Sequence, residues 1–209
     1  MSASVSLTRP GSSALDEETA RAELYGVLSQ LYYAPPSPEL LSALRVAVTE
    51  APMEGGFLQE PWQQLVAAAR AQDDVAIAAE YDRLFGGVGK PEVFVYASHY
   101  LAGFLNEKPL ARLRTSLDRL GLARGDTMPE TEDHVAYLCE VMRYLIAGDD
   151  MAVCNLTAQR DFFAEHIQPW LPAMCNALEQ HPAASFYAAV ARLTRAFAAV
   201  EAQGFDMLD

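Results

Sequence analysis

The chain has 209 residues, of which 51% are hydrophobic and 21% are charged. This composition supplies enough apolar side chains for a sizeable core and excludes a wholly disordered chain. Acidic residues number 28 and basic residues 15, so the formal net charge is −13. General nucleic-acid binding and attachment to anionic lipid both need a basic surface, so both classes are disfavoured. An acidic surface suits a basic partner, although it can also serve solubility alone.

The cysteines and the N-terminal residues indicate the cellular compartment. Cys139, Cys154 and Cys175 are odd in number and form no CxxC pair, which argues against a disulfide framework or a structural zinc site and indicates a reducing cytoplasm. Residues 1–15 are small and polar and lack an apolar signal sequence, so we expect a flexible tail there. No run of about 18 apolar residues suggests a membrane span.

Apolar residues spaced three and four apart predict a series of helices in the first half of the chain. The first begins at residue 16 and ends before two prolines. The second has Ser37 as its N-cap and a proline in its first turn. Further helices are predicted from Pro61 and from Asp73, and the latter ends at Gly86. Loops are predicted over residues 51–60 and 86–93.

The second half is also predicted to be helical. Residues 96–105 fit either a helix or a short strand, because periodicity alone does not separate the two. After Ile167, two prolines at 169 and 172 interrupt the pattern, and Ser185 is a candidate cap for a last helix. A polar loop is predicted over 123–130. Helices are predicted around residues 110–120, 135–147, 153–167 and 185–203.

Period-two alternation is hard to find along the chain, and alanine is abundant. We therefore predict an all-α fold, a compact single-domain helical bundle of roughly nine helices over residues 16–209. No sequence signature of a nucleotide-binding loop, a dinucleotide-binding fold, a zinc protease or a serine hydrolase is present. None of the four histidines lies three or four residues from another, so we predict neither a bound metal nor a cofactor.

The densest polar cluster is Glu130-Thr131-Glu132-Asp133-His134, directly before the strongest apolar pattern. Thr131 is an N-cap candidate, and acids complement the positive end of a helix dipole. Capping thus explains two or three of these residues. It does not explain His134, which is unfavourable at that end when protonated. A binding site is therefore the alternative interpretation.

Aromatic residues crowd two parts of the chain, around residues 81–104 and 162–187. Most of them are expected in the core. If a few line a groove, an apolar groove with an acidic rim would suit an amphipathic basic peptide.

Four short motifs occur in order along the chain. They are Tyr81-Asp82-Arg83-Leu84-Phe85-Gly86, Val95-Tyr96-Ala97-Ser98-His99-Tyr100, Glu130-Thr131-Glu132-Asp133-His134, and Phe162-Phe163 followed by His166, Pro169 and Trp170. Together they resemble the TorD/DmsD/NarJ family of molybdoenzyme maturation chaperones, also called redox enzyme maturation proteins. The resemblance runs from about residue 20 to 201. Val95 and Thr131 stand where the family has proline, which changes the backbone restriction at both places.

This resemblance implies an all-α fold with no catalysis of its own. It implies a cytoplasmic chaperone that binds the twin-arginine signal peptide or the body of an apo-molybdoenzyme catalytic subunit. Such a chaperone delays export until the molybdopterin cofactor has been inserted. The acidic net charge is compatible with a partner that carries two arginines.

The resemblance also suggests where a peptide would bind. We expect the connectors that carry the second and third motifs to lie side by side and to flank one groove. Apolar surface is expected from the first two motifs and acidic groups from the third. Alternatively, Asp133 and His134 only cap and pin the helix. The predicted peptide-binding residues are Leu84, Phe85, Ser98, Tyr100, Glu130, Glu132, Asp133 and His134.

Two other functions are considered beside the chaperone. One is a small helical enzyme that uses His134 with Asp133 or Glu132 as a general base, which would need a closed pocket with convergent titratable groups. The other is a ligand-binding regulator, although no basic DNA-binding stretch is present. The sequence does not distinguish a monomer from a dimer, and the connectors at 86–93 and 123–130 are long enough for domain exchange.

Overall fold

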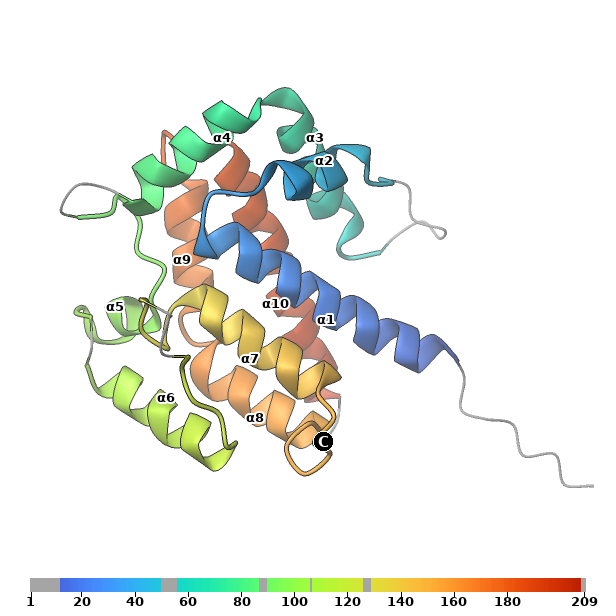
Figure 1. Ribbon diagram of the computed structural model, residues 1–209, viewed down its shortest axis with the longest axis vertical. Helices are drawn as coiled ribbons and strands as arrows, with labels where there is room; N and C mark the ends of the chain where they lie inside the picture. The colour runs from blue at the N-terminus through green and yellow to red at the C-terminus, as the bar shows by residue number, and fades with distance from the viewer. Residues whose placement is uncertain (1–11, 50–55, 87–89, 106, 126–128, 208–209) are drawn as a thin grey trace, which may run out of the picture.

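The computed structural model of the protein describes residues 12–49, 56–86, 90–105, 107–125 and 129–207 (Figure 1). Within these ranges the chain forms ten α-helices, one π-helical turn and no strand, which confirms the predicted all-α fold class. The elements are α1 (Ser12–Tyr33), α2 (Pro38–Val46), α3 (Gln59–Ala71), α4 (Asp74–Tyr81), η1 (Asp82–Gly86), α5 (Ala97–Ala102), α6 (Lys108–Arg119), α7 (Val135–Ala147), α8 (Leu156–His166), α9 (Leu171–Glu179) and α10 (Phe186–Asp206).

The bundle is organised around three long helices. Helix α1 packs along α7, and α10 packs against α9 and α3. Figure 1 shows α1 and α7 side by side across the front of the view, with α10 behind them. Large buried side chains from each of the three helices fill the space between them, among them Tyr32, Met142 and Phe186. No helix of the described ranges is both long and apolar enough to cross a membrane.

Helix starts with a local capping residue follow the sequence pattern. Ser37 Oγ accepts a hydrogen bond from the backbone N–H of Leu40 at 3.2 Å, and Asp73 Oδ1 accepts one from Ala76 at 2.8 Å. In each helix the cap satisfies one of the N–H groups that have no partner within the helix. The predicted starts of α2 and α4 are therefore confirmed.

The start of α10 differs from its prediction, because Ser185 makes no side-chain cap. The carboxylate of Glu80, at the end of α4, takes that place. It accepts backbone hydrogen bonds from Ser185 at 2.9 Å, Phe186 at 3.1 Å and Tyr187 at 2.7 Å. A carboxylate at a helix N-terminus is favoured by both the free N–H groups and the helix dipole. Glu80 is buried and thereby fixes α4 against α10.

Two further boundaries differ from the sequence interpretation. Helix α1 begins at Ser12 rather than at residue 16, so the predicted tail 1–15 overlaps the helix; residues 1–11 lie outside the described ranges. The sequence does not predict helix α9, because Pro169 and Pro172 interrupt the helical pattern. Pro172 instead lies in the first turn of α9, where its missing N–H costs no hydrogen bond. Trp170 lies between α8 and α9, and its indole N–H donates a hydrogen bond to the carbonyl of His166, at the end of α8, at 2.7 Å.

The segment at 96–105, for which the sequence allows either a helix or a short strand, forms a helix. Its central part is the short helix α5, and Tyr96 just before it pairs with His134 in an isolated antiparallel bridge. Gly103 ends α5 with a φ of 78°, a left-handed conformation that glycine adopts without strain. The predicted loops at 51–60, 86–93 and 123–130 lie partly outside the described ranges, which omit residues 50–55, 87–89 and 126–128.

Candidate functional site

The connectors that carry the second and third motifs lie side by side. The backbone N–H of Ala97 donates to the carbonyl of Asp133 at 3.0 Å, and that of Val135 donates to Val95 at 2.8 Å. These bonds flank the bridge between Tyr96 and His134. The expectation that the two connectors lie side by side is therefore confirmed, and they meet at this isolated bridge just before α7.

Asp133 is the central residue of this junction. Its Oδ2 accepts hydrogen bonds from the backbone N–H of Ser98 at 2.9 Å and from Ser98 Oγ at 2.5 Å. Its Oδ1 accepts a third from Thr131 Oγ1 at 2.6 Å. Asp133 is 1% exposed and Ser98 is fully buried. The carboxylate therefore ties the start of α5 to the start of α7, and it has little contact with solvent.

His134, rather than Thr131, is the N-cap of α7. Its Nδ1 accepts a hydrogen bond from the backbone N–H of Ala136 at 3.1 Å, so the Thr131 capping prediction is wrong. Burial lowers the pKa of His134 to about 4, against the opposing effect of the charges of Glu130 and Asp133. The imidazole is thus neutral near pH 7, which removes the conflict between a histidine and the positive end of the helix dipole.

Glu132 is paired with two arginines of the same chain. Its carboxylate accepts hydrogen bonds from Arg114 at 2.9 and 3.1 Å, and Arg124 lies 3.9 Å away. Burial opposes the charged form of Glu132, but the hydrogen bond from Arg114 and the charges of both arginines outweigh it and lower its pKa. The acid is therefore ionised and already neutralised within the chain.

Glu130 lies among tyrosines from several elements. Its carboxylate accepts a hydrogen bond from the hydroxyl of Tyr96. Burial and the charge of Glu130 raise the pKa of Tyr81, at the end of α4, to about 12. Tyr33, at the end of α1, is 43% exposed, and its ring lies 6.4 Å from that of His134. We call this group of Glu130, Tyr33, Tyr81 and Tyr96 the Glu130 patch.

The apolar residues of the predicted site occupy different places. Leu84 is fully buried and offers no surface. Phe85 is half-buried and packs edge to face on Tyr81, with ring centres 5.0 Å apart, so it adjoins the Glu130 patch. Tyr100 is half-buried and stacks on Trp170 of the fourth motif at 5.8 Å, while its hydroxyl donates to the carbonyl of Phe94. Burial raises the pKa of Tyr100 to about 12.

A cleft of about 160 Å³ borders the junction on the side of α6 and α8. Asp133 and Ala97 line it from the junction, and Glu165 and His166 line it from α8. The volume is below the ~300–1,000 Å³ typical of ligand pockets, so it accommodates a single side chain rather than a peptide. The third and fourth motifs thus reach one cleft, which their separation in the sequence does not indicate.

Sequence reasoning did not select Tyr33, Tyr81 and Tyr96 as site residues. Tyr81 and Tyr96 carry a signal, because both fall within the motifs. Tyr33 carries only a weak one, a second tyrosine before the two prolines that end α1. Among the described residues, no three acidic, histidine or cysteine side chains gather in a way that could hold a metal ion.

Comparison with known proteins identifies the family. A model of the nitrate reductase delta subunit family matches residues 56–176. The chaperone protein TorD of Vibrio cholerae (strain ATCC 39541) is 30% identical over 193 residues, covering 85% of this chain and 88% of that protein. The chain belongs to the TorD family of molybdoenzyme chaperones. The TorD protein of V. cholerae strain M66-2 is 31% identical over 193 residues. That of Shewanella loihica is 26% identical over an alignment of 220 residues, which covers 94% of this chain and 98% of the relative.

Membership of the TorD family decides between the functions considered from the sequence. The protein is a molybdoenzyme maturation chaperone and not an enzyme, as its relatives are named chaperones. Its partner is accordingly a molybdoenzyme subunit. The general-base alternative also has a structural difficulty. The Nδ1 atom of His134 is occupied by the helix cap, and the side chain is 3% exposed.

Proposed function

We propose that this TorD-family chaperone binds the twin-arginine leader of an apo-molybdoenzyme catalytic subunit at the Glu130 patch, in the cytoplasm. By holding the leader, it delays export until the molybdenum cofactor has been inserted into the client. The observation that carries this proposal is the grouping of a half-exposed carboxylate with three tyrosine rings at the junction of the motifs.

The chemistry of the patch suits an arginine. A carboxylate accepts charge-assisted hydrogen bonds from a guanidinium, and the planar guanidinium also stacks on aromatic faces. Glu130 is the acid of the third motif that is best placed for this contact. Asp133 is buried with its hydrogen bonds formed, and Glu132 is neutralised by Arg114. Phe85, beside Tyr81, adds apolar surface next to the patch.

The remaining residues of the predicted site then have positioning roles. Ser98, Asp133 and His134 fix the connector from which Glu130 projects, and Leu84 anchors the segment that carries Phe85. A peptide-binding side chain on a rigid scaffold binds more tightly, because less conformational entropy is lost on association.

The proposal is tested by titrating a labelled twin-arginine leader peptide against the Glu130→Gln variant. We expect binding to weaken by about 1–3 kcal/mol, the range for a lost charge-assisted hydrogen bond. Glu140→Gln is the matched control, because Glu140 is also half-exposed and also pairs with a group of this chain, Arg143. A peptide in which lysines replace both arginines should bind more weakly to the unmodified protein, since lysine cannot form the planar bidentate contact. Equal affinity of the Glu130→Gln and Glu140→Gln variants would contradict the proposal.

A further inference from the structure

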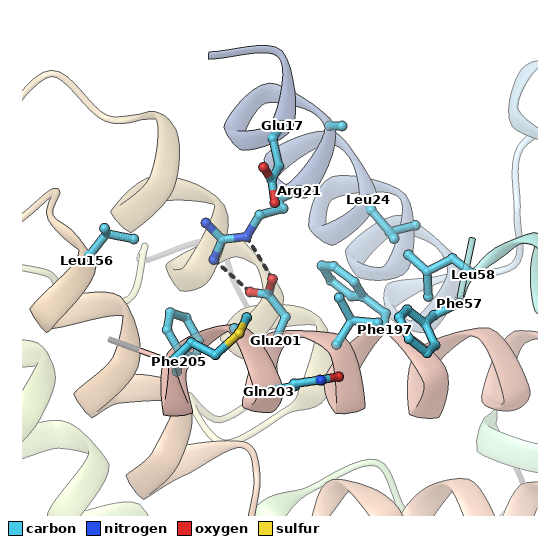
Figure 2. A pocket seen from close by; sticks show the side chains of 14 residues that line it. Glu17, Arg21, Leu24, Phe57, Leu58, Leu156, Phe197, Glu201, Gln203 and Phe205 are labelled. Carbon is cyan, nitrogen blue, oxygen red and sulfur yellow. Dashed lines mark hydrogen bonds and ion pairs between the residues drawn. The ribbon is translucent and has the colours of Figure 1, made fainter. Parts of the chain in front are cut away.

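A groove of about 550 Å³ lies between the first half of α1 and the last half of α10 (Figure 2). Residues from just before and at the start of α3 and α8 also line it, among them Phe57, Leu58 and Leu156. Its volume falls in the range typical of ligand pockets, ~300–1,000 Å³. None of its lining residues belongs to the Glu130 patch or to the four motifs.

The floor of the groove holds a buried ion pair. Arg21 donates from Nε to Glu201 Oε1 at 2.7 Å and from Nη2 to Oε2 at 2.8 Å. Tyr25 donates to the same carboxylate at 3.1 Å, and Arg21 also donates to Gln159 Oε1 at 3.1 Å. Glu201 is 4% exposed. Because the two charges neutralise each other inside the protein, the floor attracts neither an anion nor a cation strongly.

The walls of the groove are apolar. Figure 2 shows Leu24, Phe57, Leu58 and Phe197 gathered at one end and Leu156 and Phe205 at the other, with the ion pair between them. Phe57 is 78% exposed, and Met207 at the rim is 75% exposed. Large apolar side chains that stay exposed around a concave surface mark an interaction site more often than a packing defect.

Gly204 keeps part of this groove open. It lies in the last turns of α10, and a Cβ added there would meet no atom within 4 Å. Glycine is unfavourable within a helix by ~0.8–1 kcal/mol relative to alanine, and the structure places no steric demand on this position. The absence of a side chain therefore leaves space in the groove at some cost to the helix.

We propose that this groove binds an apolar segment of the client polypeptide that carries one basic residue. The inference rests on the proposed function, since it requires a client with exposed apolar segments. The charge of the lining supports the basic residue. Arg21 and Glu201 neutralise each other, and Glu17, which lies exposed at the rim, leaves the lining with one negative charge in excess. The lining part of α1, from Glu17 to Leu24, is about 10 Å long at 1.5 Å per residue, which matches three or four extended residues or two helical turns.

The test is fluorescence anisotropy with a short labelled peptide, a run of leucine and alanine behind a single arginine. Gly204→Leu adds a bulky side chain to the lining of the groove, and Phe57→Ser removes an aromatic ring from one end. We expect each to weaken binding about tenfold or more, the effect of excluding one large apolar side chain. Gly204→Ala adds only a methyl group and should change affinity much less. Val75→Ser is the matched control for Phe57→Ser, because Val75 is 79% exposed on α4 and does not line the groove.

Thermal melts accompany each titration, and none of these variants should lower the melting temperature, because the altered positions are exposed or open. A labelled peptide with serine in place of every leucine should not bind. Equal affinity of Gly204→Leu and the unmodified protein for the leucine peptide overturns the proposal. It is also overturned if the groove belongs to another occupant. If residues 1–11 of the same chain fill the groove, the double variant Val5→Ser/Leu7→Ser would release them and raise the affinity for the peptide tenfold. If a second copy of the chain fills the groove, Gly204→Leu would abolish a dimer seen by sedimentation.

A second titration separates this inference from the proposed function. The twin-arginine leader peptide is measured against Glu130→Gln and Gly204→Leu in parallel. If the leader does not bind the unmodified protein while the leucine peptide binds in a Gly204-dependent way, the proposed function fails and the groove stands. If the leader binds in a Glu130-dependent way and the leucine peptide ignores Gly204→Leu, the groove fails alone.

Discussion

Replacement of Asp133 by alanine tests whether the third motif acts through structure. The variant removes an acceptor from three hydrogen bonds and leaves the backbone N–H and hydroxyl of Ser98 without that partner in a fully buried position. A buried donor without a partner costs ~1–3 kcal/mol. Thr131 is half-exposed and can turn to water, so its loss adds less. We therefore expect a loss of about 3–5 kcal/mol in the free energy of unfolding.

The loss is measured by urea unfolding and by thermal melts, both followed by circular dichroism. For a domain of this size ~1 kcal/mol shifts the melting temperature by about 2–4 °C, so Asp133→Ala should melt roughly 6–20 °C lower. Asp133→Asn keeps one oxygen for Ser98 and should lose about half as much. A double-mutant cycle with Ser98→Ala should give a coupling energy of at least ~1 kcal/mol. If Asp133→Ala unfolds at the same urea concentration as the unmodified protein and loses leader binding, Asp133 contacts the peptide and the structural argument is wrong.

Two further predictions concern buried polar groups. The pKa of His134 is lowered to about 4, so between pH 6.5 and pH 4 the unfolded chain binds a proton that the folded chain does not. His134 should therefore lower the free energy of unfolding as the pH falls through that window, by about 2 kcal/mol at pH 5. His134→Asn keeps a capping oxygen without the titration, so urea unfolding at pH 7 and pH 5 should show a smaller pH effect in this variant; an unchanged slope would contradict the assignment. Glu80→Gln replaces a carboxylate that accepts three backbone N–H groups with an amide of one acceptor oxygen and should lower the free energy of unfolding by about 2–3 kcal/mol. Urea unfolding beside the exposed control Glu60→Gln measures it, and equal midpoints for the two would refute the role of Glu80 at α10.

Those parts of the fold that depend on near neighbours in the sequence were predicted well. The caps at Ser37 and Asp73 and the helical period of the apolar residues are local signals, because cap and helix lie within a few residues of each other. The start of α10 was predicted less well, because its carboxylate cap comes from Glu80, over 100 residues earlier. Helix α9 was missed because a proline in a first turn and a proline that breaks a helix look the same without the helix around them.

In the candidate site, too, features carried by short motifs were predicted from the sequence, whereas contacts between distant residues were not. That the two connectors meet was expected from their motifs, and their backbone hydrogen bonds confirm it. Which acid faces solvent was not predictable, because Glu130, Glu132 and Asp133 are chemically alike. Their environments separate them: Arg114 lies against Glu132, Ser98 against Asp133, and Tyr96 against Glu130. The groove between α1 and α10 had no sequence signal, since its residues come from four distant segments.

These environments bear on how motif residues of this kind are interpreted. A residue within a binding motif need not contact the ligand. Asp133 and His134 form the hydrogen bonds that start α7 and hold α5 against it, while Glu130 projects from the same connector beside Tyr96. A change at Asp133 would therefore displace Glu130 and weaken peptide binding indirectly. Affinity measurements alone cannot separate the two roles, whereas affinity measured together with unfolding free energy can, because Glu130→Gln should change only the first and Asp133→Ala should change both.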